Sequence, residues 1–578
     1  MKNFVSLIKY LKPYKKWALL APFLIVFEVI MDLCMPNIMA NIINVGIGSN
    51  DVSYIVYNII LMVILTVLGM FGGLGSAYFA AKASGYASAD MRKNVFAKVM
   101  NLSFLNLDKI KTGHIITVLT NDITLIGEVM MYILRLLFRI PIILIGSIFM
   151  AIMISPRLSL VLVVIIPITV IVVSFILRKA FPKFQELQQR VDDVNTLVRE
   201  NVGGIRVVKS FTNEGYEIAK FQKSNELLRR TSVTATRIIC ITMPVMMLFI
   251  NMAIVAVLWF GGIEVIGGDM LIGDVIAFIQ YLTNILSALL MGSVIIVMLS
   301  HSEASALRVN DICTYDDDFS DSLGHKKDIL GHIVFDNVDF SYGGTDVCVL
   351  KNLNFSILPG EMIGIVGATG SGKTTLVNLI NRCYDVTKGK ILIDGVNVKD
   401  YNLKFLRQNI GIALQQPILF SGTIRDNLKY ANGKISDTLM KKVAKIVQID
   451  KFIIKSASKY DLKVEQKGLN FSGGQKQRIS LGRTLLANPR ILILDDTTSA
   501  VDTNTDKKIR DGLKKFYSDV TILLISSRVC SVIEADRIMV IDEGKIVDFD
   551  THDNLLASCT IYQGIYNSQV KDGDINAR

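Results

Sequence analysis

The chain has 578 residues, 51% of them hydrophobic, and a formal net charge of +11. This length exceeds that of one ordinary domain, and this share of apolar residues excludes a wholly soluble globular protein. Residues 40–53 and 261–274 contain no Lys or Arg, whereas basic residues are frequent in 81–129 and 178–237, so the charge follows the positive-inside pattern of a membrane protein and no nucleic-acid partner is expected.

Six apolar stretches in the first 300 residues are long enough to span a bilayer, which takes about 20 residues. They are residues 17–40, 54–80, 130–154, 158–177, 238–260 and 275–299. An even number of spans places both ends of the chain on one side of the membrane, and the basic connections mark that side as cytoplasmic. We therefore expect a multi-pass protein of the cell (plasma) membrane, in contact with the lipid bilayer, with both termini in the cytoplasm.

The two cytoplasmic connections, within 81–129 and 178–237, are rich in helix formers and charge, as in "FPKFQELQQRVDDVNTLVREN". We expect them to be helices that continue from the bilayer into water. A polar, turn-rich linker follows at 311–330, and beyond it short apolar runs alternate with helical stretches, which predicts a parallel sheet flanked by helices. The predicted organisation is an all-α membrane domain at 1–310 and an α/β domain at 331–578.

The segment "GATGSGKTT" follows the apolar run "MIGIV" and precedes the helical pattern "TLVNLI". This is a P-loop in its strand–loop–helix context, so the α/β domain is predicted to bind a nucleotide. Its glycines let backbone N–H groups face the phosphates of ATP, Lys373 supplies a cation, and Thr374 offers a hydroxyl to Mg²⁺. ATP and Mg²⁺ are therefore the expected cofactors.

A second apolar strand, "ILILDD", ends in two carboxylates. Asp495 suits the coordination shell of Mg²⁺, because this cation prefers oxygen ligands close to bound phosphates. Asp496 lies next to it, where a residue that orients the attacking water belongs. A pair of acidic residues at a strand end means little alone, but the P-loop upstream makes the catalytic interpretation the better one.

The segment "FSGGQKQR" lies between these two motifs. A P-loop followed by "SGGQ" and "LILDD" resembles the ATP-binding-cassette (ABC) transporter family, and with six preceding spans the chain is similar to exporter half-transporters. Residues 107–122 and 200–215 resemble the cytoplasmic loops of that group, which carry short coupling helices. The resemblance implies that two nucleotide-binding domains close head to tail around two ATP molecules, each held between the P-loop of one chain and the "SGGQ" of the other.

The resemblance assigns further roles residue by residue. The residues that it places around this chain's own ATP are Tyr342, Gly367, Ala368, Thr369, Gly370, Ser371, Gly372, Lys373, Thr374 and Thr375. Those that it places around the partner's ATP are Ser472, Gly473, Gly474 and Gln475. It also places Gln415 with Thr374 and Asp495 around Mg²⁺, and Asp502 in a loop that crosses the dimer interface.

Two catalytic positions depart from the family pattern. The family's glutamate after the metal-binding aspartate is here Asp496, and the family's histidine is here Ser527, in "ISSR". Both side chains reach less far, and a misplaced water-orienting group costs on the order of 10²-fold in rate. One interpretation is a degenerate site that binds ATP and hydrolyses it poorly, as in one subunit of heterodimeric bacterial multidrug exporters; the other is tolerated drift with normal activity. The first favours a heterodimer over a homodimer.

Charged residues also occur inside the predicted spans. Glu28 and Asp32 lie four residues apart in the first span, and Arg135 and Arg139 repeat this spacing in the third, so each pair shares one helix face. Ionisable residues within a membrane usually face a bundle interior or a water-filled cavity. They either line a path for cationic or amphipathic cargo, or pair with one another and snorkel toward an interface.

The sequence thus predicts one subunit of an ATP-driven efflux pump, an ABC-type transport ATPase for small hydrophobic or amphipathic molecules, with a second half-transporter as its partner. A lipid or peptide exporter and an ATP-gated sensor that moves no cargo remain alternatives, because no residue pattern separates them. An importer is disfavoured by the resemblance, since importers generally keep the spans and the ATPase on separate chains.

Overall fold

The computed structural model describes residues 2–315, 324–343 and 347–571. The chain divides into two compact units, and each unit is made of two separate segments. The first unit contains Met1–Lys98 and Gly113–Thr314, and the second contains Val99–Thr112 and Tyr315–Arg578. Within the expected linker, residues 316–323 lie outside the described part of the chain.

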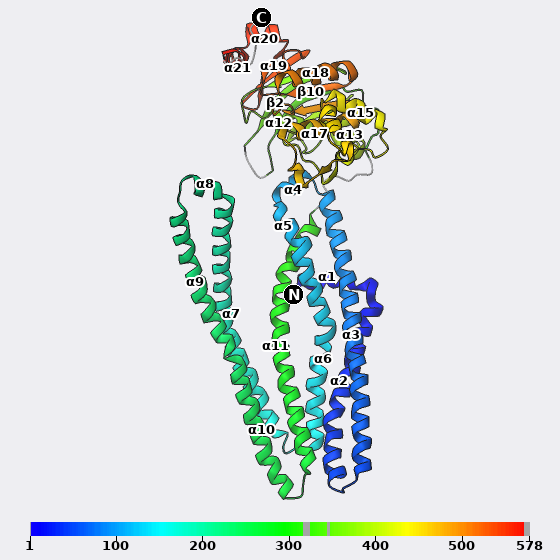
Figure 1. Ribbon diagram of the computed structural model, residues 1–578, viewed down its shortest axis with the longest axis vertical. Coiled ribbons are helices and arrows are strands. Elements are labelled where there is room, and N and C mark those ends of the chain that lie inside the picture. The colour runs from blue at the N-terminus through cyan, green and yellow to red at the C-terminus, as the bar shows by residue number, and fades with distance from the viewer. Residues whose placement is uncertain (1, 316–323, 344–346, 572–578) are drawn as a thin grey trace. The chain divides into compact units, whose positions relative to one another are not determined.

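The first unit is built of helices (Figure 1). In chain order they are α1 Lys2–Leu7, η1 Ile8–Tyr14, α2 Lys15–Asn41, η2 Ile42–Ile47, α3 Val52–Asn101, α5 Thr112–Thr117, η3 Val118–Asp122, α6 Ile123–Ile154, α7 Leu160–Gly203, α8 Ile205–Ser210, α9 Glu214–Cys240, α10 Thr242–Ile266 and α11 Ile272–Thr314. A helix satisfies its backbone polar groups internally, which is why long apolar runs destined for lipid adopt it.

Among the described residues of this unit, six helical stretches are long and apolar enough to cross a membrane, and each overlaps one of the six stretches expected from the sequence. This confirms the predicted helical membrane domain. The longest helices, α3 and α7, have 50 and 44 residues. At 1.5 Å per residue each is about 65–75 Å long, more than twice the hydrocarbon thickness of a bilayer. Both therefore extend into water; α7 and α9 lie side by side and are joined by α8 (Figure 1).

One face of α11 is central to the apolar core of the first unit. Phe278, Tyr281, Leu282 and Ile285 are fully buried in a cluster that includes residues of α7 and α10. The Tyr281 hydroxyl donates a hydrogen bond to the carbonyl oxygen of Leu33 in α2 at 2.7 Å. Residues at this spacing share a helix face, so these contacts fix the rotation of α11 and leave its other face for a cavity.

A buried ion pair ties the far end of α11 to η3, a π-helical turn. Asp122 of this turn is only 4% exposed. Arg308 donates from Nε to one carboxylate oxygen at 2.8 Å, and Ser305 donates to the other oxygen, also at 2.8 Å. Both oxygens of the buried carboxylate are therefore partnered, as a charge in this position requires.

The second unit combines helices and strands (Figure 1), and its described residues form three sheets. Its strands are β1 Ile333–Phe340, β2 Leu350–Ile357, β3 Met362–Val366, β4 Lys388–Ile393, β5 Val396–Asn397, β6 Ile410–Ala413, β7 Gly422–Thr423, β8 Lys463–Val464, β9 Ile491–Asp495, β10 Thr521–Ile525, β11 Arg537–Asp542 and β12 Lys545–Asp550. The six-stranded sheet has the order β12-β11-β3-β10-β9-β6 and is parallel apart from the pair β11–β12. The four-stranded sheet, β2-β1-β4-β5, is antiparallel, and β7 pairs with β8.

Helices complete the second unit. They are α4 Phe104–Lys109, α12 Lys373–Ile380, η4 Val398–Asp400, α13 Leu403–Asn409, α14 Ile424–Leu428, α15 Asp437–Ile446, α16 Asp450–Lys455, η5 Lys459–Asp461, η6 Gln466–Gly468, α17 Gly473–Leu486, α18 Thr503–Phe516, α19 Val529–Val532, α20 His552–Ser558 and α21 Thr560–Lys571. A largely parallel sheet with helices confirms the predicted α/β domain.

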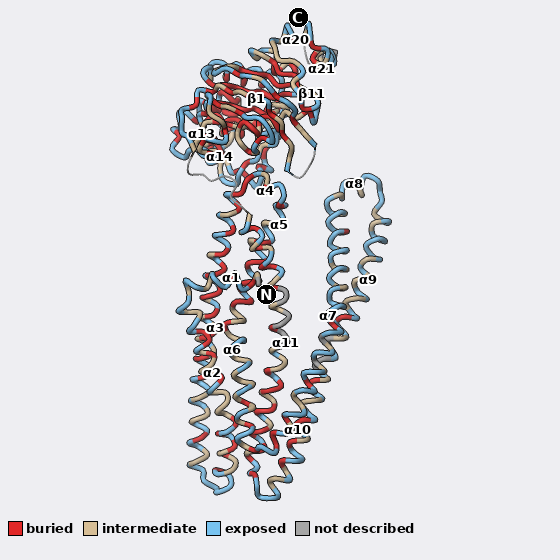
Figure 2. Tube along the Cα trace, turned by 180° about the vertical axis from the view of Figure 1, so that it is seen from behind, coloured by how far each residue is buried: buried red, intermediate tan, exposed pale blue. Residues whose placement is uncertain are grey.

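Two apolar clusters cover the two faces of the six-stranded sheet, and Figure 2 shows buried residues gathered inside this unit. Along β9, Ile491 and Ile493 belong to the cluster that includes α12 and the four-stranded sheet. Leu492 and Leu494 belong to the cluster that includes α15 and α17. Successive side chains of a strand alternate between faces, so a strand buried on both sides reads as the continuous apolar run seen in the sequence.

Candidate functional site

The loop between β3 and α12 holds the residues expected to bind phosphate. Gly367 has a φ of 155° and Gly372 a φ of 101°. A Cβ atom at Gly367 would lie 2.0 Å from the carbonyl oxygen of Ile541, so only glycine fits this turn. The turn brings Lys373 and Thr374 to the start of α12, where unpaired N–H groups and the helix dipole favour an anion.

A cavity of about 250 Å³, here called the ATP cavity, opens beside this loop. Its lining residues are Val349, Thr369, Gly370, Gly372, Lys373, Thr374, Thr375, Gln415, Asp495, Asp496, Ile525 and Ser527. Several segments meet here because the carboxyl ends of parallel strands share one edge of a sheet. Gly367, Ala368 and Ser371 belong to the same loop but are not among the lining residues.

Lys373 folds back onto its own loop. Its Nζ donates hydrogen bonds to the carbonyl oxygens of Gly367 at 2.9 Å and Ala368 at 2.7 Å. Burial lowers the pKa of Lys373, while the carboxylates of Asp495 and Asp496 act in the opposite direction. Phosphate oxygens are stronger partners for an ammonium group than neutral carbonyls, so the cation is placed to exchange these carbonyls for phosphate.

Thr374 and Asp495 contact each other in the ATP cavity. The Thr374 hydroxyl donates to Oδ2 of Asp495 at 2.9 Å. Asp495 is 3% exposed, and burial raises its pKa, with the charge of Asp496 adding to the effect. Gln415 lines the same cavity. Hydroxyl, carboxylate and amide oxygens suit Mg²⁺, which needs only one or two carboxylates when phosphates supply further ligands, so the donor set fits this ion.

Asp496 and Ser527, the two positions that depart from the family pattern, lie side by side. The Ser527 hydroxyl donates to Oδ1 of Asp496 at 3.5 Å, a distance at the outer limit of hydrogen bonding. Asp496 has a φ of 47°, in the left-handed region that Asp adopts more readily than most residues. Both side chains line the ATP cavity, but they hold each other only loosely.

Tyr342, the expected adenine contact, lies beside the phosphate loop. Its hydroxyl is 3.0 Å from Oγ1 of Thr375. Its ring packs edge-on against Phe340 and Tyr384, with ring centroids 4.9 Å and 5.2 Å away. Tyr342 does not line the ATP cavity itself; it stands beside the first turn of α12.

The signature residues Ser472–Gln475 lie apart from the ATP cavity. Ser472 caps α17: its Oγ accepts from the N–H of Gln475 at 3.3 Å, and the Gln475 side chain accepts from the N–H of Ser472 at 2.9 Å. Ser472 and Gly473 are exposed, and none of the four residues lines the ATP cavity. A capped and exposed helix N-terminus is suited to an anion that this chain's own P-loop does not hold.

Arg528 and Gln477 are candidates that sequence reasoning missed. Arg528 donates from its two terminal nitrogens to the carbonyl oxygens of Val501 and Ser499, both at 3.1 Å. Gln477 of α17 donates to Oγ of Ser499 at 3.0 Å. Asp502 ends this loop as the N-cap of α18. The expected interface loop is thus tied both to the signature helix and to the segment that carries the altered serine.

The short helix α4 packs within the second unit. Tyr384 donates its hydroxyl proton to Asp108 at 2.6 Å, and its ring centroid lies 6.3 Å from that of Phe104. Burial, followed by the hydrogen bond to Asp108, raises the pKa of Tyr384, so the hydroxyl stays protonated and remains a donor. No motif indicated Tyr384. A second short helix, α8, lies in the other segment expected to carry a coupling helix, 200–215.

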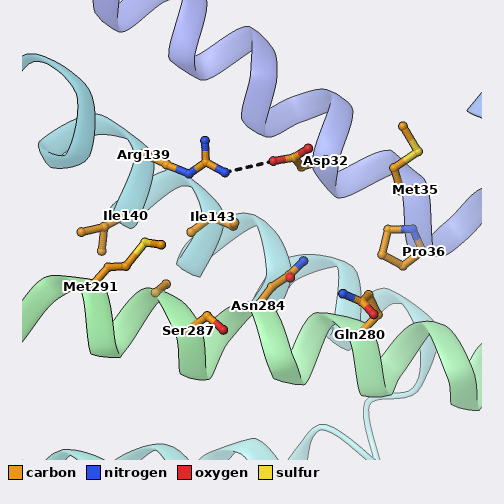
Figure 3. A pocket seen from close by; sticks show the side chains of 11 residues that line it. Asp32, Met35, Pro36, Arg139, Ile140, Ile143, Gln280, Asn284, Ser287 and Met291 are labelled. Carbon is orange, nitrogen blue, oxygen red and sulfur yellow. Dashed lines mark hydrogen bonds and ion pairs between the residues drawn. The ribbon is translucent and has the colours of Figure 1, made fainter. Parts of the chain in front are cut away.

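In the first unit, Arg139 of α6 joins two carboxylates of α2. It donates from Nη1 to Glu28. It also donates from Nη2 to Asp32 at 3.2 Å, the contact drawn in Figure 3. The side chain of Asp32 is 43% exposed and that of Glu28 only 17%. Mutual pairing, one of the two alternatives for the charged residues in the spans, therefore occurs for three of the four. The Nε atom of the fourth, Arg135, is buried and has no hydrogen-bond partner among the described residues.

A cavity of about 390 Å³, here called the membrane cavity, lies beside this pair (Figure 3). Asp32 and Arg139 line it, whereas Glu28 and Arg135 do not. The other lining residues are Met35, Pro36, Ile140, Ile143, Gln280, Asn284, Ser287, Ala288 and Met291. Three of these, Gln280, Asn284 and Ser287, share one face of α11 by their spacing. The membrane cavity thus combines a charged end, a row of uncharged polar groups and apolar side chains.

Known proteins match the chain over nearly its whole length. Residues 18–290 match the family described as "ABC transporter transmembrane region", and residues 350–499 match "ABC transporter". The chain is 35% identical over 562 residues to the uncharacterized ABC transporter ATP-binding protein YfiB of Bacillus subtilis, which covers 97% of this chain and 98% of that protein. It is 32% identical over 571 residues to the uncharacterized ABC transporter ATP-binding protein Rv1273c of Mycobacterium tuberculosis, 97% of each chain.

Proposed function

Because the chain belongs to the ABC transporter family and joins a membrane domain to an ATP-binding domain, we propose that it is one half of an exporter that uses ATP to move small amphipathic molecules. The observation that carries the proposal is one chain with six span-length helices and an ATP cavity that unites Lys373, Asp495 and Gln415. In this proposal the protein lies in the plasma membrane with its ATP-binding domain in the cytoplasm, on the side of the basic connections.

Within its own ATP site the chain assigns each group a task. Lys373 and the loop Gly367–Gly372 bind the phosphates, and Tyr342 contacts the adenine. Thr374, Asp495 and Gln415 hold Mg²⁺, which neutralises charge on the phosphates when it is bound. The 2.9 Å contact between Thr374 and Asp495 supports this set.

Hydrolysis at this site is slow in the proposal, because Asp496 and Ser527 are both too short. Their mutual contact of 3.5 Å leaves neither group firmly placed, and a water-orienting group displaced by about 1 Å costs on the order of 10²-fold in rate. The chain therefore holds ATP at its own site and turns it over slowly.

The signature Ser472–Gln475 serves a second half-transporter in this proposal. Its residues lie outside the chain's own ATP cavity, and the capping box of α17 takes up only the N–H groups of Ser472 and Gln475, so the first-turn N–H groups of Gly473 and Gly474 remain for the partner's phosphates. Asp502 then lies at the interface between the two chains. One intact signature beside one impaired ATP site favours a heterodimer, with fast hydrolysis at the site built on the partner's P-loop.

The membrane cavity is the proposed cargo path. Asp32 is its exposed carboxylate, and Arg139 is shared with Glu28, so a cargo cation is able to pair with Asp32 while Arg139 remains neutralised by Glu28. Ile140 and Ile143 offer an apolar surface beside this charge. Arg135 does not line the membrane cavity. The chemistry suits a small molecule with one cationic and one apolar part.

Transport by the complex in lipid vesicles tests the proposal. The vesicles contain the complex purified from its own cells, and uptake of a cationic dye and of a neutral dye of equal size is measured with ATP outside. We expect ATP-dependent uptake that vanishes with Lys373→Ala, and Asp32→Asn should reduce cationic uptake at least fivefold more than neutral uptake.

Ser287→Ala is the matched control, because Ser287 lines the same cavity without a charge. It should affect both dyes equally. ATP hydrolysis without uptake of any dye, lipid or peptide would indicate an ATP-gated sensor instead of an exporter. Equal loss of both dyes in Asp32→Asn would leave export intact as a function and remove the charged cargo path.

A further inference from the structure

The last helix of the chain, α21, contacts the segment that carries Ser527. The Gln569 side chain reaches back 42 positions along the sequence: its Nε2 donates to the carbonyl oxygen of Ser527 at 2.8 Å. Its Oε1 accepts from the N–H of Val529, also at 2.8 Å. We propose that Gln569 is a positioning residue for ATP hydrolysis, and that α21 acts as a clamp on the loop 526–529. The inference rests on the proposed ATP site of this chain.

Only a side-chain amide makes this pair of contacts. Ser527 presents an acceptor and Val529 a donor, and Gln569 supplies the opposite group to each from one rigid plane. Glutamate has two acceptors, so it would repel the carbonyl of Ser527, and leucine of similar size would satisfy neither group. The two bonds fix the backbone on both sides of Arg528 and thereby set the direction from which the Ser527 side chain approaches Asp496.

The helix that carries Gln569 is itself well anchored. Tyr562, two turns earlier on α21, is fully buried, and its hydroxyl lies 2.7 Å from Nδ1 of His552 on α20. Tyr562 belongs to the apolar cluster beneath the sheet. Because α21 is packed into the core at Tyr562, the position of Gln569 is fixed, and its hydrogen bonds restrain the loop 526–529.

The other side of the loop is held by Arg528, which donates to the carbonyl oxygens of Ser499 and Val501. Hydrogen bonds from Gln569 and from Arg528 therefore hold the loop 526–529 on two sides. The 3.5 Å contact between Ser527 and Asp496 is the weakest link in this arrangement. Removing the Gln569 grip should free Ser527 to move away from the ATP cavity, with a cost to hydrolysis and little cost to nucleotide binding.

The test uses the complex with four forms of this chain: native, Gln569→Leu, Asp496→Glu with Ser527→His, and all three changes together. Hydrogen exchange of the peptide that covers 526–530 reads the loop directly. Single-turnover hydrolysis of ATP bound to this chain, measured at rising ATP concentration, gives the rate constant and the half-saturating concentration of its own site, here written kcat and KM, without the contribution of the partner's site. We expect Gln569→Leu to speed exchange of the Val529 amide at least tenfold. We expect it to lower kcat roughly tenfold in the restored chain but less than twofold in the native one, with KM within twofold.

The matched control is Asn567→Ala, an exposed position on the same helix, which should change neither exchange nor kcat. Gln569→Glu should also speed exchange, because it keeps the acceptor for the Val529 N–H but places a second acceptor against the carbonyl oxygen of Ser527. Unchanged exchange in Gln569→Leu overturns the clamp, and so does an equal fold-loss of kcat in both backgrounds, since a merely structural residue acts in that way.

The result also separates this inference from the proposed function. If Asp496→Glu with Ser527→His fails to raise hydrolysis, the degenerate-site proposal is wrong and the native site is an ordinary one. Gln569→Leu must then lower kcat of the native complex itself, and an unchanged kcat there overturns the clamp. If the complex binds no ATP at this chain, the proposed ATP site fails first, and photolabelling with an azido-ATP reports that outcome.

Discussion

Asp496 and Ser527 meet at 3.5 Å in the ATP cavity, and the backbone at Asp496 is left-handed. Two free-energy changes of opposite sign follow when the family residues Glu and His are restored at these positions. Better placement of the water is worth on the order of 10²-fold, or about 2.7 kcal/mol. Glutamate tolerates a positive φ less well than aspartate, at a cost of roughly 1 kcal/mol. The first term is the larger.

We therefore expect Asp496→Glu with Ser527→His to raise hydrolysis at this site about tenfold, with smaller gains from either change alone because the two residues act as a unit. Single-turnover hydrolysis of ATP bound to this chain measures the gain. If one single change raised hydrolysis as much as the double variant, Asp496 and Ser527 would not act as a unit.

Two neighbouring signature glycines differ in the space around them. A Cβ at Gly474 would lie 2.6 Å from the carbonyl oxygen of Ala500, whereas a Cβ at Gly473 would meet only the Ala500 Cβ at 3.5 Å. Both changes to alanine gain up to about 1 kcal/mol of helix propensity. We expect Gly474→Ala to lower the Tm of the second unit by several degrees because it displaces the interface loop, and Gly473→Ala to leave the Tm unchanged or slightly higher. Calorimetry of both variants checks the difference.

At the scale of elements, α4 takes part in a hydrogen bond to a charged group within its unit, between Tyr384 and Asp108. Tyr384→Phe removes the hydrogen bond to Asp108, and a hydrogen bond to a charged group is worth about 1.5–3 kcal/mol. The ring contact with Phe104 remains. If α4 is a coupling helix, this variant should hydrolyse ATP at nearly the native rate but transport less cargo per ATP. Uptake and ATPase measured in the same vesicles give that ratio, and a parallel fall of both would assign the bond to folding alone.

The same elements show where sequence reasoning succeeds. The P-loop was predictable because strand, loop and helix are consecutive. Thr374 and Asp495 meet because Thr374 lies after β3 and Asp495 is the last residue of β9, two parallel strands of one sheet. The six helices long enough to span a membrane follow from apolar length alone. The contacts of Tyr384 and Gln569 were not predictable: their partners lie 276 and about 40 positions away, and neither residue belongs to a motif. Helices and strands produce a periodic pattern of apolar residues in the sequence, whereas a contact between two single polar side chains far apart in the chain produces no such pattern.

At the scale of the whole molecule, the proposal is an asymmetric pair of chains. In that proposal, this chain has an impaired pair, Asp496 and Ser527, at its own ATP site and an intact Ser472–Gln475 signature, so two copies of it would combine two poor sites. We expect the chain purified alone to show less than about a tenth of the ATPase rate of the complex, given the roughly 10²-fold cost of misplacement. The comparison needs only ATPase assays at equal protein concentration. Equal rates would restore an ordinary homodimer.

The second unit begins with residues 99–112 and resumes only at Tyr315. During synthesis α4 therefore leaves the ribosome about 200 residues before β1, the first strand of the second unit. At 5–20 residues per second this delay is about 10–40 seconds. For that time the apolar side chains of Phe104 and Leu105 are without the rest of the second unit, on which α4 packs in the folded protein. In the nascent chain, α4 is therefore exposed before the domain that it packs on has been synthesised. A fragment that starts at Tyr315 has the opposite defect, because it contains the α/β domain but lacks residues 99–112, which belong to the same unit.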